Sequence, residues 1–130
     1  MAPLEAVLEQ ADVVVVCCLL TEETRGLFGA DAFARMKPSA FFINVARGPI
    51  HDEPALIDAL RRGQIAGTGL DVTAVEPIEP GNPLLSMENT LITAHALCWT
   101  DECFEDIART ALRSIADVSL GRRPAHVVTV

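Results

Sequence analysis

Three ionisable residues that lie far apart in the sequence have side chains suited to the chemistry of a small carboxylic acid. Arg47 lies in the segment NVARG, Glu76 in AVEPI and His95 in ITAHA. A guanidinium offers a planar fork of N–H donors that matches a carboxylate. An imidazole donates or accepts a proton near neutral pH, and a neighbouring carboxylate favours its charged form. Together the three predict a site that holds an anion and exchanges a proton with it.

Each of these residues also has an ordinary structural explanation. Arg47 alone is consistent with a surface arginine in a loop, and Glu76 with a loop acid before a proline. A lone histidine among apolar neighbours, such as His95, is more often a structural residue than a catalytic one. The functional interpretation therefore depends on whether the fold brings the three together.

The elements that must position these residues begin with strand-like runs. Four apolar runs predict strands, at residues 12–20, 40–45, 65–72 and 90–93. The first run is apolar almost throughout, as expected for a parallel strand that is covered on both faces.

Helical patterns separate these runs and follow the last one. A short pattern is ended by Pro38. The next begins at Asp52, with a proline in its first turn, and Gly63 closes it. The last begins with Asp101, carries apolar residues at helical spacing and finishes before Gly121.

This order of elements predicts an α/β fold, a partial doubly wound, Rossmann-like parallel sheet with a C-terminal helix. Binding sites in such folds lie beyond the carboxyl ends of the strands. Arg47, Glu76 and His95 each come at or after the end of a predicted strand. We therefore expect them to meet at one edge of the sheet.

Composition and charge exclude several classes of protein. The 130 residues include 10 basic and 18 acidic side chains, giving a net charge of −8, and 50% of them are hydrophobic. A nucleic-acid binder needs a basic surface, and no apolar run approaches the roughly 20 residues of a membrane span. The N-terminal segment lacks the basic region of a signal peptide. We expect a cytoplasmic protein whose partners include neither nucleic acid nor membrane.

The cysteines do not point to a metal site. Cys17, Cys18, Cys98 and Cys103 lack the paired CxxC spacing of a zinc site. Reduced thiols that behave as small buried hydrophobic side chains are the simplest explanation. A small metal or redox protein built on these cysteines is the disfavoured alternative.

The ordered combination of segments resembles one known family. NVARG, DEPALIDALRRGQIAGTGLDV, EP and LITAHA follow one another as in the second half of the cofactor domain of the D-isomer-specific 2-hydroxyacid dehydrogenases. Members that reduce glyoxylate or hydroxypyruvate look most similar, partly through Trp99. The resemblance implies that residues 1–121 are a partial NAD-binding domain and residues 122–130 a C-terminal tail.

The resemblance also implies catalytic roles. Arg47 would bind the substrate carboxylate, His95 would be the acid/base, and Glu76 would keep His95 charged. The reaction would be hydride transfer between NAD(P)H and a small 2-oxo acid such as glyoxylate or hydroxypyruvate.

The same resemblance implies residues that contact the cofactor, NAD or NADP. Asp71, in GLDV, would hold the nicotinamide carboxamide. The backbone around Val45 and Ala46 would line the nicotinamide, together with Arg47 and His95.

Several features of the family are missing. The glycine-rich phosphate loop and the acidic residue that reads the adenosine ribose are absent, and Gly67-Thr68-Gly69 leads into a strand rather than a helix. Ala94 stands where a proline usually precedes the histidine, and Pro49 and His51 differ after the arginine. We expect a surface role for His51 at a helix entry, and negligible turnover by this chain alone.

The missing half also predicts how the chain associates. The run 12–20 is a central strand in the family and would be an apolar edge strand here, which favours association. We expect a homo-oligomer, or contact with a second polypeptide, through residues 12–20. The alternative to an enzyme is a nucleotide-sensing or protein-interaction module that reuses the half-domain.

Overall fold

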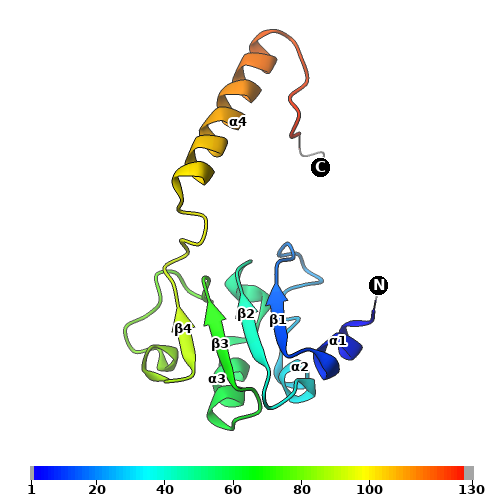
Figure 1. The fold of residues 1–130 in the computed structure, drawn as a ribbon, viewed down its shortest axis with the longest axis vertical. Coiled ribbons are helices and arrows are strands. Elements are labelled where there is room, and N and C mark those ends of the chain that lie inside the picture. The colour runs from blue at the N-terminus through cyan, green and yellow to red at the C-terminus, as the bar shows by residue number, and fades with distance from the viewer. Residues whose placement is uncertain (1, 128–130) are drawn as a thin grey trace. The chain divides into compact units, whose positions relative to one another are not determined.

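The computed structural model describes residues 2–127. The chain divides into two compact units, Met1–Ala96 and Leu97–Val130. The first unit contains a parallel sheet with helices, and the second contains a single long helix (Figure 1).

The sheet has four parallel strands in the order β1-β2-β3-β4. Their bounds are Val13–Val16, Phe41–Asn44, Gly67–Leu70 and Thr90–Ile92. Across the sheet, Val16 pairs with Asn44, Asn44 with Leu70, and Leu70 with Ile92. The strands therefore end level with one another, at what we call the carboxyl edge of the sheet.

The four predicted strands are confirmed, and the first is shorter than expected. Residues 12–20 were predicted, whereas β1 ends at Val16. Its partner β2 ends at Asn44 and turns into a loop, and the last bond between the two segments runs from the Val45 N–H to the Val16 carbonyl at 3.4 Å. The expectation that this strand is covered on both faces of the sheet is also wrong for the described residues, because Val13 and Val15 are 53% and 54% exposed.

Three helices pack against one face of this sheet. α2 (Ala30–Arg35) and α3 (Glu53–Arg61) occupy the predicted positions, and α1 (Leu4–Gln10) was not predicted. The Asp52 side chain caps α3 by accepting from the Ala55 N–H at 3.0 Å. Short 3₁₀ helices, η1 (Gly48–Ile50) and η2 (Pro83–Ser86), lie in the loops after β2 and β3.

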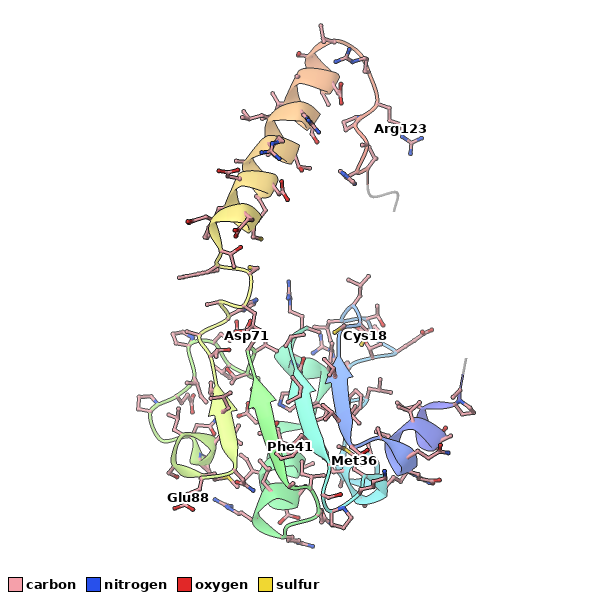
Figure 2. All side chains as sticks on the ribbon, viewed as in Figure 1. Cys18, Met36, Phe41, Asp71, Glu88 and Arg123 are labelled. Carbon is pink, nitrogen blue, oxygen red and sulfur yellow. The ribbon has the colours of Figure 1, made fainter. Side chains whose placement is uncertain are left out.

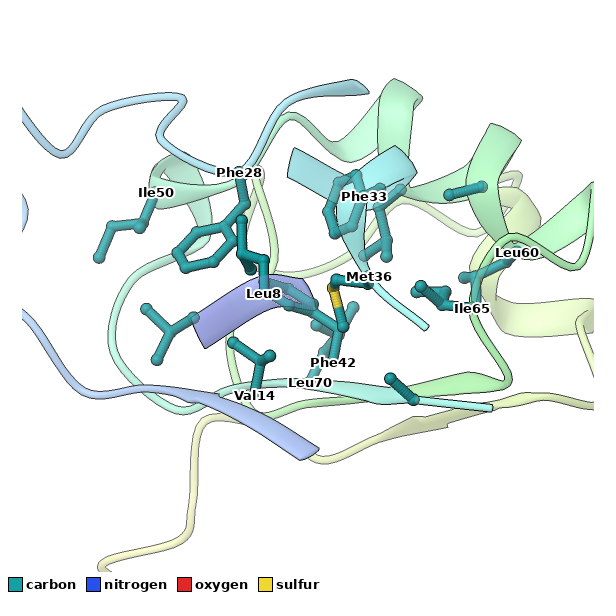
Figure 3. Close-up of a cluster of buried hydrophobic side chains, with 14 of the residues drawn as sticks. Leu8, Val14, Phe28, Phe33, Met36, Phe42, Ile50, Leu60, Ile65 and Leu70 are labelled. Carbon is teal, nitrogen blue, oxygen red and sulfur yellow. The ribbon is translucent and has the colours of Figure 1, made fainter. Parts of the chain in front are cut away.

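The hydrophobic core lies between these helices and the sheet (Figure 3). Leu8 of α1 and Phe33 of α2 are buried against Phe42 of β2. The Phe33 and Phe42 rings meet edge to face with centroids 5.2 Å apart. This packing holds the strands in place, and with them the carboxyl edge.

The second unit contains α4 (Asp101–Ser119), the predicted C-terminal helix. Thr100 caps it by accepting from the Cys103 N–H at 3.2 Å. Its apolar residues, including Phe104 and Ile115, are exposed within the described chain. Throughout residues 2–127, the helices lack the combined length and apolar character needed to cross a bilayer.

The cysteines differ from the expectation of buried thiols. Cys17, Cys18 and Cys98 are exposed and Cys103 is half-buried, and all four are free. Among the described residues, His, Cys, Asp and Glu side chains form no group of three or more that could hold a metal ion.

Candidate active site at the carboxyl edge

The fold brings the three candidate catalytic residues to the same edge. Arg47 follows β2, Glu76 follows β3 and His95 follows β4, and these strands are neighbours whose ends are level. Figure 2 shows Asp71 and Cys18 at this edge, opposite the end of the sheet where Phe41 lies.

Glu76 and His95 are in direct contact. Nδ1 of His95 lies 2.8 Å from Oε2 of Glu76, and Oε1 of Glu76 accepts from the Thr73 N–H at 3.2 Å. The hydrogen bond from His95 is the largest cause of a lowered pKa of Glu76, and the Thr73 N–H and the charge of Arg47 add to it. An ionised carboxylate only accepts, so Nδ1 of His95 carries the hydrogen and Nε2 is left for another partner.

Asp71 holds the segment that carries His95. Its Oδ1 accepts from the Thr93 hydroxyl at 2.6 Å and from the Ala96 N–H at 2.9 Å, one on each side of His95. Asp71 is buried, and His95 has a φ of 52°, in the left-handed region that non-glycine residues seldom adopt. The carboxylate therefore fixes an unusual backbone conformation at the candidate acid/base.

Arg47 lies beside this pair and is exposed. Its Nη1 donates to the Ala46 carbonyl at 2.6 Å, and its charge is one of the causes of the lowered pKa of Glu76. A cavity of about 430 Å³ opens next to it, lined by Arg47 and residues of two loops, Cys17, Cys18, Leu19, Leu20, Val45 and Ala46. The guanidinium is therefore available to an anion from solvent.

A second cavity, of about 540 Å³, lies on the side of Glu76 and His95. One part of its wall is apolar, with Ile78, Leu85 and Ile92. The other part is polar and is formed by Asp71, Thr73, Glu76 and His95. A wall of this kind suits a flat ring that carries an amide, such as nicotinamide.

The backbone at Val45 and Ala46, expected to line the nicotinamide, is organised by the Asn44 side chain. We call residues 45–47 the Arg47 loop. Oδ1 of Asn44 accepts from the Ala46 N–H, and Nδ2 donates to the Arg47 carbonyl, both at 2.9 Å. Asn44 is fully buried, and its role was not found from the sequence, because an asparagine at a strand end is equally typical of an ordinary turn.

His51 also differs from its expected place. It is only 3% exposed, so the expected surface role is wrong. Burial lowers the pKa of His51 and outweighs the nearby carboxylates of Glu53 and Asp52, which raise it.

Two further contacts fix the loops after β2 and β3 relative to each other. A Cβ at Gly48 would overlap the carbonyl of Thr73, so the two backbones pack directly. Glu53 of α3 accepts from the Ala74 N–H at 2.9 Å and from Nδ2 of Asn82 at 2.7 Å. The glycine after Arg47 was a visible signal, whereas nothing local in the sequence indicates the role of Glu53.

Comparison with known proteins identifies the family to which this fold belongs. Residues 1–96 match the model of the D-isomer specific 2-hydroxyacid dehydrogenase NAD binding domain. Glyoxylate/hydroxypyruvate reductase B from Shigella boydii serotype 4 is 44% identical over 119 residues, which cover 92% of this chain and 37% of that protein. The protein of that name from Salmonella gallinarum is 45% identical over the same length.

Solved structures give the same result. D-lactate dehydrogenase with NAD+ from Lactobacillus jensenii superposes with a TM-score of 0.89 at 30% identity, covering 99% of this chain and 43% of that one. A D-isomer specific 2-hydroxyacid dehydrogenase from Xanthobacter autotrophicus Py2, in complex with NADPH and MES, has a TM-score of 0.86 at 41% identity, covering 97% and 51%. With its sheet, its carboxyl edge and these matches, the chain belongs to the D-isomer-specific 2-hydroxyacid dehydrogenase family and contains part of its NAD-binding domain.

Proposed function

We propose that the carboxyl edge is the catalytic part of an NAD(P)H-dependent oxidoreductase that acts on a small 2-oxo acid such as glyoxylate or hydroxypyruvate. The chain spans 37% of the length of the relative named for that reaction. We therefore propose these residues as part of the machinery for that activity and not as the whole of it. The contact of Glu76 with His95 beside an exposed arginine is the observation that carries the proposal.

Arg47 is the group that would bind the substrate carboxylate. It is exposed next to a cavity, and its fork of N–H donors matches two carboxylate oxygens. Binding there would replace its present bond to the Ala46 carbonyl. Arg47 would thereby place the adjoining carbonyl carbon of the substrate at the same edge as His95.

His95 is the proposed acid/base. Its Nδ1 donates to Glu76, so Nε2 is the atom that would exchange a proton with the substrate oxygen. During reduction, Nε2–H of the charged ring gives its proton to the carbonyl oxygen as that oxygen gains negative charge. Glu76, whose pKa is lowered by the hydrogen bond from His95, is the ionised acceptor that keeps Nδ1 of the ring donating and leaves Nε2 to face the substrate.

The residues around the 540 Å³ cavity fit the nicotinamide of NAD or NADP. Asp71 and His95 belong to its polar wall, and the Arg47 loop, which includes Val45 and Ala46, follows the neighbouring strand β2 at the same edge. When bound there, the cofactor would supply or accept the hydride. Asp71 would add a bond from the carboxamide to the bonds that it makes to Thr93 and Ala96.

Ligand titration of the ¹⁵N-labelled chain tests this assignment. Glyoxylate is expected to shift the amide signals of Ala46 and Arg47, and NADH those of Asp71 and Ala96. Arg47→Ala should abolish the response to glyoxylate, whereas Arg62→Ala, which removes an exposed arginine paired with Asp58, should leave it intact. A chain that responds to neither ligand, and that binds a protein partner equally well after Arg47→Ala, would be the interaction module instead.

The remaining expectations are also proposals. Residues 1–121 are proposed as the partial NAD-binding domain, supported by α4 ending at Ser119 and by Gly121 with a φ of 68°. Residues 122–130 are proposed as the tail, of which 128–130 lie outside the described residues. A cytoplasmic location is supported by four free cysteines.

Association through residues 12–20 is proposed as well. In the described sheet β1 pairs on one side only, and the side chains of Val13 and Val15 are more than half exposed. An apolar strand with unpaired backbone groups is a template for pairing with another chain. A second copy of this chain or another polypeptide would pair with this edge.

A further inference from the structure

A buried histidine lies immediately behind the Arg47 loop. His51 follows η1, and its Nδ1 is 2.9 Å from Nδ2 of Asn44. Both residues are buried, so neither exchanges this contact for water.

The backbone determines the direction of this hydrogen bond. The Ala46 N–H can only donate, so the atom of Asn44 that faces it must be Oδ1. The Arg47 carbonyl can only accept, so the amide nitrogen Nδ2 faces it. That nitrogen is a donor, and Nδ1 of His51 must therefore accept. The ring is neutral, with its hydrogen on Nε2.

We propose that His51 is a positioning residue for the Arg47 loop. Its bare Nδ1 fixes the Asn44 side-chain amide, and that amide fixes the backbone of Ala46 and Arg47. The importance of this loop for substrate binding rests on the proposed function, whereas the positioning itself does not.

Packing alone does not explain a histidine here. The ring meets Phe42 edge to face, with centroids 5.8 Å apart, and backbone pairing places it beside Phe28. Its Nε2 is buried without a hydrogen-bond partner among the described residues, which costs free energy. A phenylalanine would fill the same space without that cost. The ring nitrogens of His51 therefore need another explanation, and the hydrogen bond between Nδ1 and Asn44 provides one.

Protonation would break the arrangement. A hydrogen on Nδ1 would face the N–H groups of Asn44, and turning the amide over to avoid this would sacrifice its bonds to Ala46 and Arg47. At the start of α3, Asp52 and Glu53 favour the charged ring, whereas Phe42, whose ring contacts it, and Phe28, whose backbone pairs with His51, are uncharged. Burial is the larger effect and keeps the ring neutral. Acidification should therefore release the Arg47 loop.

NMR spectroscopy of the purified chain tests the proposal without substrate or cofactor. Long-range ¹H–¹⁵N spectra at pH 7.5 should show His51 with an unprotonated Nδ1. In His51→Phe, the Ala46 amide should exchange with solvent about tenfold faster, the effect of losing about one hydrogen bond. His51→Asn, which returns an acceptor close to the position of Nδ1, should restore part of the protection. His126→Phe, at an exposed histidine of the second unit, should have no effect.

The outcomes separate this proposal from the proposed function. Unchanged exchange at Ala46 in a folded His51→Phe variant, or a proton on Nδ1 at pH 7.5, would overturn the role of His51. If His51→Phe does not fold, acid titration of the unaltered chain decides. The signals of Ala46 and Arg47 must then move with the midpoint of His51, and movement with any other midpoint overturns the proposal. Failure of glyoxylate to bind would leave all of these results unchanged.

Discussion

The backbone of Gly48 lies directly against the carbonyl of Thr73, so closely that a side chain at residue 48 would overlap it. This contact joins the loop that carries Arg47 to the loop that carries Glu76. The two loops leave neighbouring strands, β2 and β3, whose ends are level. The distance between the proposed substrate-binding arginine and the proposed acid/base pair therefore depends on a residue without a side chain.

Gly48→Ala is expected to push these loops apart. Because the overlap is with backbone atoms, which cannot rotate away, the free energy of unfolding should fall by about 1–3 kcal/mol. Urea denaturation measures this, with Gly81→Ala as the control, since a Cβ at Gly81 meets nothing within 4 Å. Equal stability of the two variants would contradict the contact.

Asp71→Ala should free the segment around His95. The substitution leaves the Thr93 hydroxyl and the Ala96 N–H without their acceptor. We expect a loss of about 1–3 kcal/mol in the free energy of unfolding, together with faster exchange of the Ala96 amide. Asp106→Ala, which removes an exposed carboxylate paired with Arg109 on α4, is the control and should change neither quantity measurably.

The Glu76–His95 pair predicts a contribution to stability that depends on pH. The pKa of Glu76 is lowered in the folded chain, mainly by the hydrogen bond from His95, so the unfolded chain takes up the proton first on acidification. The contribution is present above the unfolded pKa of about 4.5 and is lost as the pH falls through the folded pKa. Since both side chains are more than a third exposed, we expect less than about 1 kcal/mol.

Denaturation at pH 6 and pH 3.5 measures that contribution. Glu76→Gln should reduce the difference in stability between the two pH values, whereas Glu88→Gln, at an exposed glutamate near the other end of the sheet (Figure 2), should not. An identical pH dependence in Glu76→Gln and the unaltered chain would show that the pair is absent in solution.

His51 predicts a second pH effect at higher pH. Burial lowers its pKa below the ordinary 6.5, so the unfolded state binds more protons once the pH falls below that value. The stability due to the neutral ring is complete above about pH 6.5 and decreases from there toward the folded pKa. In a comparison of denaturation midpoints between pH 7.5 and 5.5, His51→Phe should lose less stability than the unaltered chain. A larger loss of stability in His51→Phe than in the unaltered chain would contradict the lowered pKa of His51.

Val15→Lys should weaken association of the chain. It places a charge on β1, at the unpaired edge, where charged side chains disfavour strand pairing. Sedimentation velocity at several protein concentrations should show a smaller average mass than for the unaltered chain. Leu91→Lys changes an exposed residue of β4, the strand at the other edge of the sheet. It tests whether any added charge reduces the average mass. A monomeric unaltered chain would contradict association through β1.

The regular part of the fold was predictable because its signals are local. Apolar runs gave β2, β3 and β4, and Asp52 with Gly63 gave the ends of α3 to within a residue or two. The convergence of Arg47, Glu76 and His95 followed from one topological rule about parallel strands. α1 was missed because its seven residues are too few to show a helical period.

The parts that were missed depend on contacts between segments. The length of β1 depends on where its partner β2 ends. The burial of His51 depends on the ring of Phe42 and on backbone pairing with Phe28. Neither can be predicted from the residues next to β1 or His51 in the sequence. The cysteines were expected to be buried because of their residue type, yet Cys17 and Cys18 lie beyond the end of β1, where they are exposed and line a cavity. Asp71 was assigned to the cofactor by resemblance, and its bonds to Thr93 and Ala96 could not be seen in a motif.

The level ends of the strands have a consequence for how such a protein can change. The residues proposed to touch a ligand all lie at the carboxyl edge of the sheet. The packing that aligns the strands, such as Phe33 against Phe42, lies in the core between the sheet and its helices. The loops at the carboxyl edge could therefore change in sequence without disturbing the hydrophobic core. A different substrate or reaction would then require new loop sequences at the carboxyl edge and no change in the core.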